Sequence, residues 1–254
     1  MEVQNSLIRT GLLIGIDGLE KLENSRVIVF GVGGVGSFTV EALARAGVGE
    51  LTLIDNDTVD ISNLNRQIHA TYETVDKPKV DVMKERILSI NKNCKVITHQ
   101  VFVNQDNIEE LVPKDVDYVV DAIDTVTAKL GLAEYCYKNN IKLMSSMGTG
   151  NKLDPTQFKV TDVFKTKVCP LAKVMRHELR KRGVDKLKVI YSEETPLKPL
   201  SPEELGVVNK NTPKNEGEVT SITKRQTPGS ISFVPPVAGM IIASQVVRDI
   251  LGIK

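Results

Sequence analysis

A glycine-rich turn between a predicted strand and a predicted helix constrains this chain most strongly. Residues 27–30 are apolar, and residues 37–46 have helical spacing. The turn between them carries Gly31, Gly33, Gly34 and Gly36. Glycine lets the backbone turn tightly and lets a phosphate approach closely. The N–H groups at the start of the helix then face the anion. The pattern therefore predicts a phosphate-binding loop.

A carboxylate follows the glycine turn at the spacing used to bind a ribose. A second apolar run, residues 51–54, predicts a strand, and Asp55 comes directly after it. In dinucleotide-binding folds an acid about 20 residues beyond the glycines binds the ribose hydroxyls. The two features together predict a nucleotide site. Two alternatives stay open at this point, the nicotinamide site of a dehydrogenase and a glycine turn that binds no ligand.

Basic residues downstream of Asp55 favour a nucleotide whose phosphates are cleaved. Arg66 lies in the run DNDTVDISNLNRQ, and Lys79 lies in KPKVDVMKERI. A hydride-transfer site needs neither cation, whereas cleavage between the phosphates of ATP builds negative charge on the leaving pyrophosphate. The alternative is that both side chains are solvated surface charges. Lys77 is a second candidate for the role of Lys79.

Four motifs of the chain carry a family resemblance. They are GVGGVG, DNDTVDISNLNRQ, KPKVDVMKERI and DAIDT. Together they resemble the ubiquitin-activating-enzyme-like superfamily of adenylyltransferases, whose members bind ATP with Mg2+ and adenylate a carboxylate. The resemblance implies an α/β, Rossmann-like ATP-binding fold with a mostly parallel sheet and an additional C-terminal β/α portion.

The resemblance assigns roles to the residues at matching motif positions. It implies that ATP is bound by Gly31, Gly33, Gly34, Gly36, Asp55, Asp57, Asn63, Arg66 and Lys79. Asp124 would serve catalysis and Mg2+, because a hard carboxylate suits Mg2+ beside phosphate oxygens, unless it caps the following helix. Asp121, in the same motif, is expected to be a cap or turn residue. Arg9 would complete the ATP site of the partner subunit in a homodimer, or else be a loose N-terminal charge.

Less specific sequence similarity over most of the chain points to one branch of the superfamily. Its segments are NRQIHA, DPTQFKVTDVFKT, PLAKVMRHELRKRG, VIYSEE and GSISFVPPVAGMIIASQVVRDIL. They resemble the enzymes that dehydrate threonylcarbamoyladenosine in tRNA. The implied reaction adenylates the carboxylate of that nucleoside and then cyclises it with net loss of water, releasing AMP and pyrophosphate.

A predicted helix over residues 171–182 carries a run of basic side chains. They are Lys173, Arg176, Arg180, Lys181 and Arg182. One interpretation is contact with the phosphate backbone of a tRNA substrate, and the other is a solvated helix face. The net charge of the whole chain is only +1, which makes no strong prediction about a polyanionic partner.

A second candidate function is activation of the C-terminus of a small ubiquitin-like sulfur-carrier protein. Superfamily members that activate proteins often carry paired CxxC zinc motifs, and this sequence has none. The three cysteines, Cys94, Cys136 and Cys169, are widely spaced, which predicts a reducing compartment such as the cytoplasm. Cys169 precedes a predicted helix, so it is either a nucleophilic thiolate or a plain helix-start residue. A sulfur-transfer protein partner also stays open.

Alternating strand and helix patterns predict parallel crossover units in the first 150 residues. Strands are predicted at 26–30, 50–54, 95–101, 117–121 and 141–146, with helices at 37–46, 77–90, 106–111 and 126–139. Beyond residue 150, strands are expected at 159–165 and 188–191 on either side of the basic helix. One domain, 1–254, is predicted to hold all of these elements.

The last third of the chain combines a polar stretch with a final apolar helix. Residues 196–229 are rich in Pro, Asn, Lys and Glu, which predicts a mobile loop near the substrate. A helix is predicted at 236–251. The apolar stretch around it, 234–247, is interrupted by prolines and a glycine and is too short to span a bilayer. The helix is therefore expected to be buried in the protein, with no membrane contact.

Overall fold

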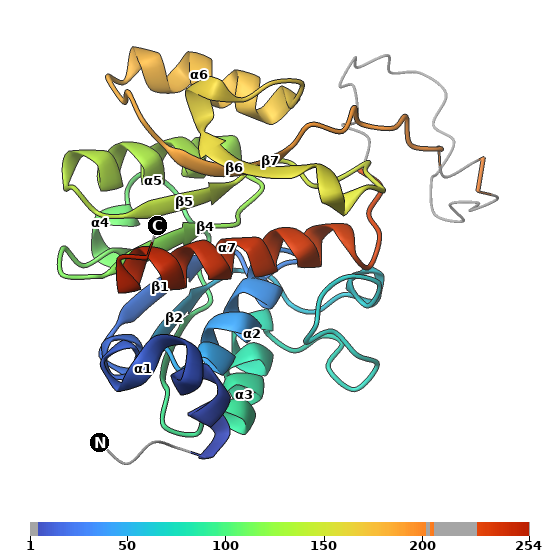
Figure 1. Ribbon diagram of the computed structural model, residues 1–254. Helices are drawn as coiled ribbons and strands as arrows, with labels where there is room; N and C mark the ends of the chain where they lie inside the picture. The colour runs from blue at the N-terminus through green and yellow to red at the C-terminus, as the bar shows by residue number, and fades with distance from the viewer. Residues whose placement is uncertain (1–4, 202–203, 206–227, 254) are drawn as a thin grey trace.

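One seven-stranded sheet with helices on both faces forms the body of the molecule (Figure 1). The structure, a computed structural model, describes residues 5–201, 204–205 and 228–253. Its strands are β1 (Arg26–Phe30), β2 (Glu50–Ile54), β3 (Lys95–His99), β4 (Tyr118–Asp121), β5 (Leu143–Ser146), β6 (Phe158–Asp162) and β7 (Lys188–Ser192). They lie in the order β3-β2-β1-β4-β5-β7-β6, and every neighbouring pair is parallel except β6 and β7. The predicted α/β fold with a mostly parallel sheet is confirmed.

The helices divide between the two faces of the sheet and bury two separate apolar cores. On one face lie α1 (Ile8–Glu23), α2 (Gly36–Ala46), α3 (Lys79–Ile90) and α7 (Val234–Leu251). On the other lie α4 (Ile108–Leu111), α5 (Val126–Lys138) and α6 (Pro170–Lys181). Covering both faces explains why β1, β2 and β4 are apolar along nearly their whole length, since strands of such a sheet meet no solvent on either side.

Several predicted element ends were wrong by a few residues. β3 ends at His99 rather than at 101, β5 begins at Leu143 rather than at 141, and α3 and α4 begin later than predicted. The clearest case is β6, predicted over 159–165, which ends at Asp162. The Asp162 carboxylate accepts the N–H of Phe164 at 2.8 Å, and the chain turns into the short 3-10 helix η4 (Val163–Lys165). Hydrogen bonds of this local kind compete with strand pairing.

Helix α1 precedes the first strand and was not predicted. It bends at Gly15, whose φ of +72° lies in the region that favours glycine. Leu12 and Leu13 on this helix are 82% and 87% exposed, while Leu19 and Leu22 are buried. Gly11, Gly15 and Gly18 fall inside α1, and glycine within a helical pattern weakens the sequence signal for a helix.

Helix α7 crosses the middle of the sheet face that it covers, against α2 (Figure 1). It begins at Val234, before the predicted start, because Pro235 and Pro236 fall in its first turn, where no N–H is needed. By length and composition α7 would also pass for a membrane span, as buried core helices do. Ile242, Val246 and other residues along it are buried against the sheet and α2, which confirms the prediction of a buried helix.

The predicted loop over 196–229 is described only at its two ends. Residues 202–203 and 206–227 lie outside the described residues. At the near end Leu197 N donates to Asn151 O at 2.8 Å, and at the far end Gly229 N donates to Asn151 Oδ1 at 2.6 Å. One residue, Asn151, in the connection after β5, therefore holds both flanks of this stretch.

Gly239→Ala should lower the free energy of unfolding by about 1–3 kcal/mol, as overpacking of a well-packed interior does. A Cβ at Gly239 would lie 2.3 Å from the carbonyl oxygen of Val35, the residue just before α2. This clash outweighs the gain of about 1 kcal/mol that alanine normally gives inside a helix. Chemical denaturation measures the change. Ser244→Ala, at an exposed position of the same helix, is the control and should not destabilise. Equal stability of Gly239→Ala and the native chain would contradict the close packing of α2 and α7.

Candidate active site

Two glycines of the turn between β1 and α2 are required by the turn itself. Gly31 has a φ of +84°, and a Cβ there would lie 2.7 Å from Ala122 O at the end of β4. A Cβ at Gly36 would lie 1.8 Å from Gly31 O. A side chain at Gly31 would force the turn away from the end of β4, and a side chain at Gly36 would force the two ends of the turn apart. At these two positions close packing of the backbone is the reason that glycine is required.

The other two glycines leave room above the loop. A Cβ at Gly33 would meet nothing closer than Gln67 Nε2, at 4.0 Å. A Cβ at Gly34 would lie 3.0 Å from Pro235 Cβ and 3.3 Å from Arg66 Cγ. The open space over Gly33 faces the start of α2, where backbone N–H groups favour an anion. The structure therefore places Arg66 directly beside a loop that is shaped to receive a phosphate.

Asp55 connects the end of β2 to the glycine loop. Its Oδ2 accepts the N–H of Val32 at 2.6 Å, and its Oδ1 accepts the N–H of Asp57 at 2.9 Å. Burial raises the pKa of this carboxyl, against the opposing effects of Lys79 and of the two N–H donors. A carboxylate oxygen has more than one acceptor site, so Asp55 can hold the loop and still accept hydrogen bonds from ribose hydroxyls.

Lys79 is buried at the start of α3 and points to the same region. Its side chain is 7% exposed, and Nζ lies 2.7 Å from Asp57 Oδ2, whose side chain is 56% exposed. Lys77, the other candidate, is exposed. The interpretation of Lys79 as a solvated surface charge is therefore wrong. An ammonium has three donors, so Lys79 can bind a phosphate oxygen while it keeps Asp57.

Arg66 is half-buried and has no carboxylate partner within the described residues. Its Nη1 donates to Ser62 O at 2.9 Å and to Asn65 Oδ1 at 2.8 Å. Burial lowers the pKa of the guanidinium, which nevertheless stays charged. Burying a cation without a counter-ion is costly, and an anion bound at Gly33 and Gly34 would remove that cost.

Asn63 shapes the connection that carries Arg66. It ends the 3-10 helix η2 (Ile61–Asn63), and its Oδ1 accepts the N–H of Asp60 at 3.1 Å. Asp60 in turn accepts the N–H of Ser62 at 2.7 Å. This reciprocal capping pattern fixes the turn. Asn63 is buried, so within this structure it supports the Arg66 segment by fixing the backbone.

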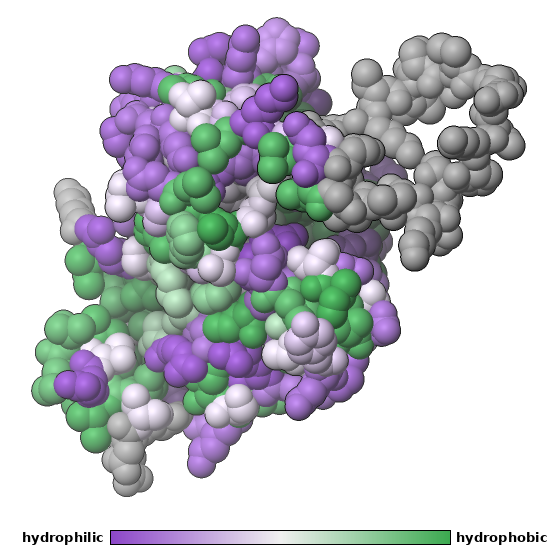
Figure 2. Space-filling model, turned by 90° about the vertical axis from the view of Figure 1, so that its right-hand side faces the viewer, coloured by the Kyte–Doolittle hydropathy of each residue, from purple (hydrophilic) through white to green (hydrophobic). Residues whose placement is uncertain are grey.

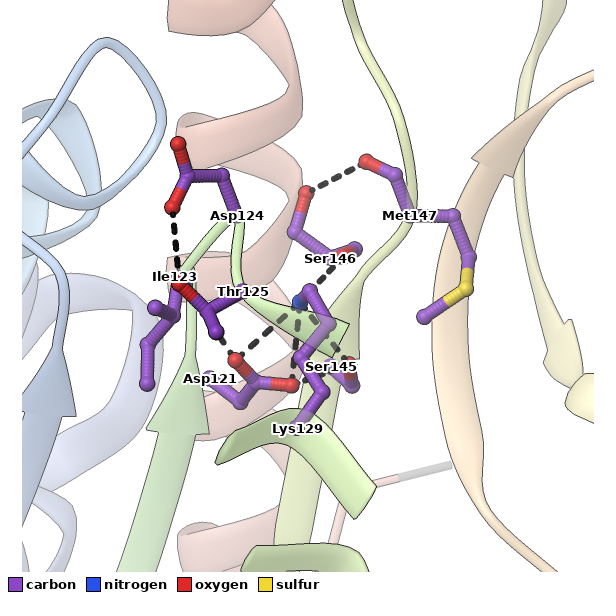
Figure 3. A network of polar contacts seen from close by, with 8 residues as sticks. All are labelled: Asp121, Ile123, Asp124, Thr125, Lys129, Ser145, Ser146 and Met147. Carbon is purple, nitrogen blue, oxygen red and sulfur yellow. Dashed lines mark hydrogen bonds and ion pairs between the residues drawn. The ribbon is translucent and has the colours of Figure 1, made fainter. Parts of the chain in front are cut away.

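The two acids of the DAIDT motif have different environments (Figure 3). Asp124 is exposed, and within the described residues its carboxylate meets only Thr125 Oγ1, at 3.4 Å. It does not cap α5, which has no side-chain cap hydrogen bond. Asp121 is fully buried and accepts the N–H of Ile123 at 3.2 Å, which fits the expected turn role. Its ion pair with Lys129 was not predicted.

Arg9 is not brought to this site within one chain. It is exposed on α1. The residue just before α1, Leu7, lies against Gly47, where a Cβ would be 3.0 Å from Leu7 Cδ1. Gly47 caps the end of α2 opposite the glycine loop. The start of α1, on which Arg9 lies, is therefore at the end of α2 that is away from the glycine loop.

The basic side chains of α6 are largely engaged in local contacts. Lys181 Nζ lies 2.8 Å from Glu178, and Arg182 Nη1 lies 2.9 Å from the same carboxylate. Arg180 lies over the Phe164 ring at 5.2 Å, and Arg176 donates to Thr166 O at 3.2 Å. Lys173 is exposed. Any RNA phosphate would have to share most of these cations with partners that they already have.

The three cysteines are free and buried. Burial raises the pKa of Cys94 to about 11 and that of Cys136 to about 12. Cys169 is only 3% exposed at the start of α6. A nucleophile needs an exposed thiolate, and none of these sulfurs has that environment. The helix-start interpretation of Cys169 therefore fits better.

Two buried polar side chains beside the site were assigned no role from the sequence. Gln67 Oε1 and both ring nitrogens of His69 are buried without a hydrogen-bond partner in the described structure. Burial, with Lys79 and Arg86 nearby, lowers the pKa of His69 to about 4. His69 is thus a neutral imidazole in the folded protein at neutral pH.

The chain resembles known proteins over nearly its whole length. The family model described as ThiF family matches residues 7–254. The chain belongs to the ThiF family. It is 47% identical over 246 residues to the tRNA threonylcarbamoyladenosine dehydratase of Bacillus subtilis, over 96% of this chain and 93% of that protein. The enzyme of the same name from Escherichia coli is 42% identical over 200 residues, 76% of this chain and 75% of that protein.

A solved structure of a relative extends the similarity to three dimensions. The crystal structure of E. coli tRNA N6-threonylcarbamoyladenosine dehydratase in complex with ATP matches with a TM-score of 0.82 and 34% identity. The match covers 96% of this chain and 93% of that one. The family resemblance drawn from the four sequence motifs is therefore confirmed.

The native chain should lose stability as the pH falls from 6.5 to 4 because of His69. The unfolded state takes up a proton near pH 6.5, whereas the folded state, with a pKa of about 4, does not. This histidine alone should reduce the free energy of unfolding by about 2–3 kcal/mol between pH 7 and pH 4.5. In His69→Phe that part of the loss should vanish. Urea denaturation at both pH values tests this, and an equal loss in the two proteins would contradict it.

Proposed function

We propose that the chain is an ATP-dependent tRNA threonylcarbamoyladenosine dehydratase. The observation that carries the proposal is the pair of cations at the glycine loop. Arg66 has no carboxylate partner among the residues that the structure describes, and Lys79 is buried at the start of α3. A nicotinamide site has no use for them. Near full-length similarity to dehydratases favours this substrate over a sulfur-carrier protein.

ATP would lie across the carboxyl edge of β1, β2 and β4. The N–H groups at the start of α2 and the open space over Gly33 would receive the phosphates. Asp55 would accept hydrogen bonds from the ribose. Arg66 and Lys79 would balance the charge that develops on the leaving pyrophosphate, which is the step that needs positive charge most.

The residues present fit a Mg2+ ion that accompanies ATP. Within the described residues no three acidic, histidine or cysteine side chains form a metal cluster. Mg2+ is usually held by one or two carboxylates together with substrate phosphates and water. Asp124 offers an exposed carboxylate with a single hydrogen bond in the part of the chain that the structure describes, which suits this role. When bound, the ion would neutralise phosphate charge.

The reaction needs no protein nucleophile. The carboxylate of the modified nucleoside attacks the α-phosphorus of ATP, a new P–O bond forms, and the bond to pyrophosphate breaks. A nitrogen or oxygen atom of the same side chain then attacks the activated carbonyl carbon. The new bond closes a ring, the bond to AMP breaks, and the side chain gives up a proton to solvent. Because the second attack is intramolecular, proximity supplies much of its rate. The buried positions of the three cysteines agree with this scheme.

A homodimer would complete the site. Four apolar side chains of α1 are exposed, Ile8 at 48%, Leu12 at 82%, Leu13 at 87% and Ile16 at 54%. Figure 2 shows the surface over α1 as an apolar area at the lower left. Apolar surface of this kind marks an interaction site, and Arg9 lies on the same helix. A second copy of the chain that covers α1 would receive Arg9 at its own ATP site.

The cellular setting follows from the substrate and from the free thiols. A tRNA-modifying enzyme with three unpaired cysteines fits the reducing cytoplasm. Contact between the tRNA and α6 is part of the proposal, with the exposed Lys173 as the candidate phosphate ligand.

Incubating tRNA with the chain and ATP should give a nucleoside lighter by one water molecule, detected by mass spectrometry after digestion. Asp124→Ala should lower turnover by about 100-fold or more, the size of effect expected when a group that stabilises transition-state charge is removed. Because Asp124 is exposed, the melting temperature should stay near the native value. Asp106→Ala removes another exposed carboxylate and is the control. No change in nucleoside mass with ATP, Mg2+ and threonylcarbamoyladenosine-containing tRNA would refute the function.

Mixing Arg9→Ala with Asp124→Ala protein should restore activity if Arg9 acts in the partner subunit. Each variant alone should be inactive. Random pairing of equal amounts gives half heterodimers with one intact site each, which is about a quarter of native activity. The measurement is the cyclisation rate of the mixture after subunit exchange, shown by mass-tagged subunits. Exchange without recovery of activity would place Arg9 outside the partner's site.

A further inference from the structure

The buried ion pair between Asp121 and Lys129 has no part in the roles assigned so far. The two side chains are 0% and 1% exposed. Lys129 Nζ lies 3.0 Å from each carboxylate oxygen of Asp121 and 2.8 Å from Ser146 O. Ser145 Oγ donates to Asp121 Oδ2 at 2.5 Å. Figure 3 shows the ammonium, from α5, between the ends of β4 and β5.

Stability is a poor explanation for a buried pair of this kind. Removing two charges from water costs about as much as their attraction returns, and apolar replacements of similar volume are often neutral or stabilising. Lys129 also interrupts an otherwise apolar stretch of α5, between the buried residues Ala128 and Leu130. The pair gives something that apolar packing cannot give, a fixed set of directional contacts between three elements.

Those contacts determine the path of the chain that carries Asp124. Asp121 also accepts the N–H of Ile123. Ala122, between Asp121 and Ile123, donates its N–H to Phe30 O at 2.8 Å, and its carbonyl oxygen lies against Gly31. The carboxylate of Asp124 has only its contact with Thr125 among the described residues. The position of Asp124 is therefore set by its backbone, and that backbone is anchored at Asp121.

We infer that Asp121 and Lys129 are positioning residues, which hold the segment 122–125 so that Asp124 faces the phosphates bound at the glycine loop. The inference rests on the proposed function for the role of Asp124. Its structural part, that the pair orders this segment, is measurable without any substrate.

The test removes both charges together, in Asp121→Asn/Lys129→Met, so that neither is left buried alone. The matched control is Lys138→Met on the same helix, whose side chain is 64% exposed. Hydrogen exchange measured by mass spectrometry should show peptides covering 122–126 opening at least about tenfold faster in the double variant than in the control. Native exchange rates there in a folded double variant would overturn the inference.

Kinetics separate positioning from a merely structural role. In the double variant kcat should fall about 100-fold, because small misplacements of reacting groups have effects of this size. The Kd for ATP, measured by calorimetry, should change less than about threefold, because Asp55, Arg66 and Lys79 stay in place. Native kcat would overturn the inference, and so would a loss of ATP affinity as large as the loss of kcat.

A milder variant decides the case if the double variant does not fold. Ser145→Ala keeps both charges and removes the 2.5 Å contact to Asp121. It should lower kcat about fivefold, the effect of one hydrogen bond, and speed exchange in 122–126. A native kcat together with native exchange rates in 122–126 would overturn the inference. If the native chain has no dehydratase activity, the proposed function fails, and the exchange measurement still decides whether the pair orders the segment.

Discussion

The close approach of Gly36 to the carbonyl oxygen of Gly31 is the constraint on which the site depends. A Cβ at Gly36 would lie 1.8 Å from that oxygen, so only glycine allows α2 to begin this near the end of β1. The same tight turn lets Gly31 lie against Ala122 after β4. From there Asp121 and Lys129 extend the connection to β5. The ends of three parallel strands are thereby held together, at the sheet edge where ligands of such folds bind.

Charge around this edge is arranged in advance of any ligand. Lys79 forms an ion pair with Asp57, and Arg66 has no acidic partner within the described residues. Each carboxylate oxygen of Asp55 accepts one backbone N–H group. Positive groups that are already in place need little rearrangement when negative charge develops on a leaving phosphate. The arrangement therefore suits cleavage of a nucleotide better than binding of a nucleotide without reaction.

The positions of the motif residues could be predicted because each motif is a short, continuous stretch of chain. Gly31 to Gly36, Asp55, Arg66 and Lys79 lie where the motifs indicated, and the structure gathers them around one loop. Residues whose environment depends on distant segments were interpreted less well. No role was assigned to Lys129 from the sequence, because only the ends of β4 and β5 make it a buried partner of Asp121. The basic run of α6 is largely paired with its own neighbours.

The sequence by itself determined the α/β class, the parallel crossover connections of the first half, and the position of the glycine loop between the first strand and the helix that follows it. These follow from hydrophobic periodicity and from local backbone requirements, which act over a few residues. Only the tertiary structure decided which charged side chains are buried, which acid faces solvent, and where Arg9 lies relative to the site. Those properties come from contacts between segments far apart in the chain, such as Leu7 with Gly47 and Ala122 with Gly31, and no local pattern encodes them.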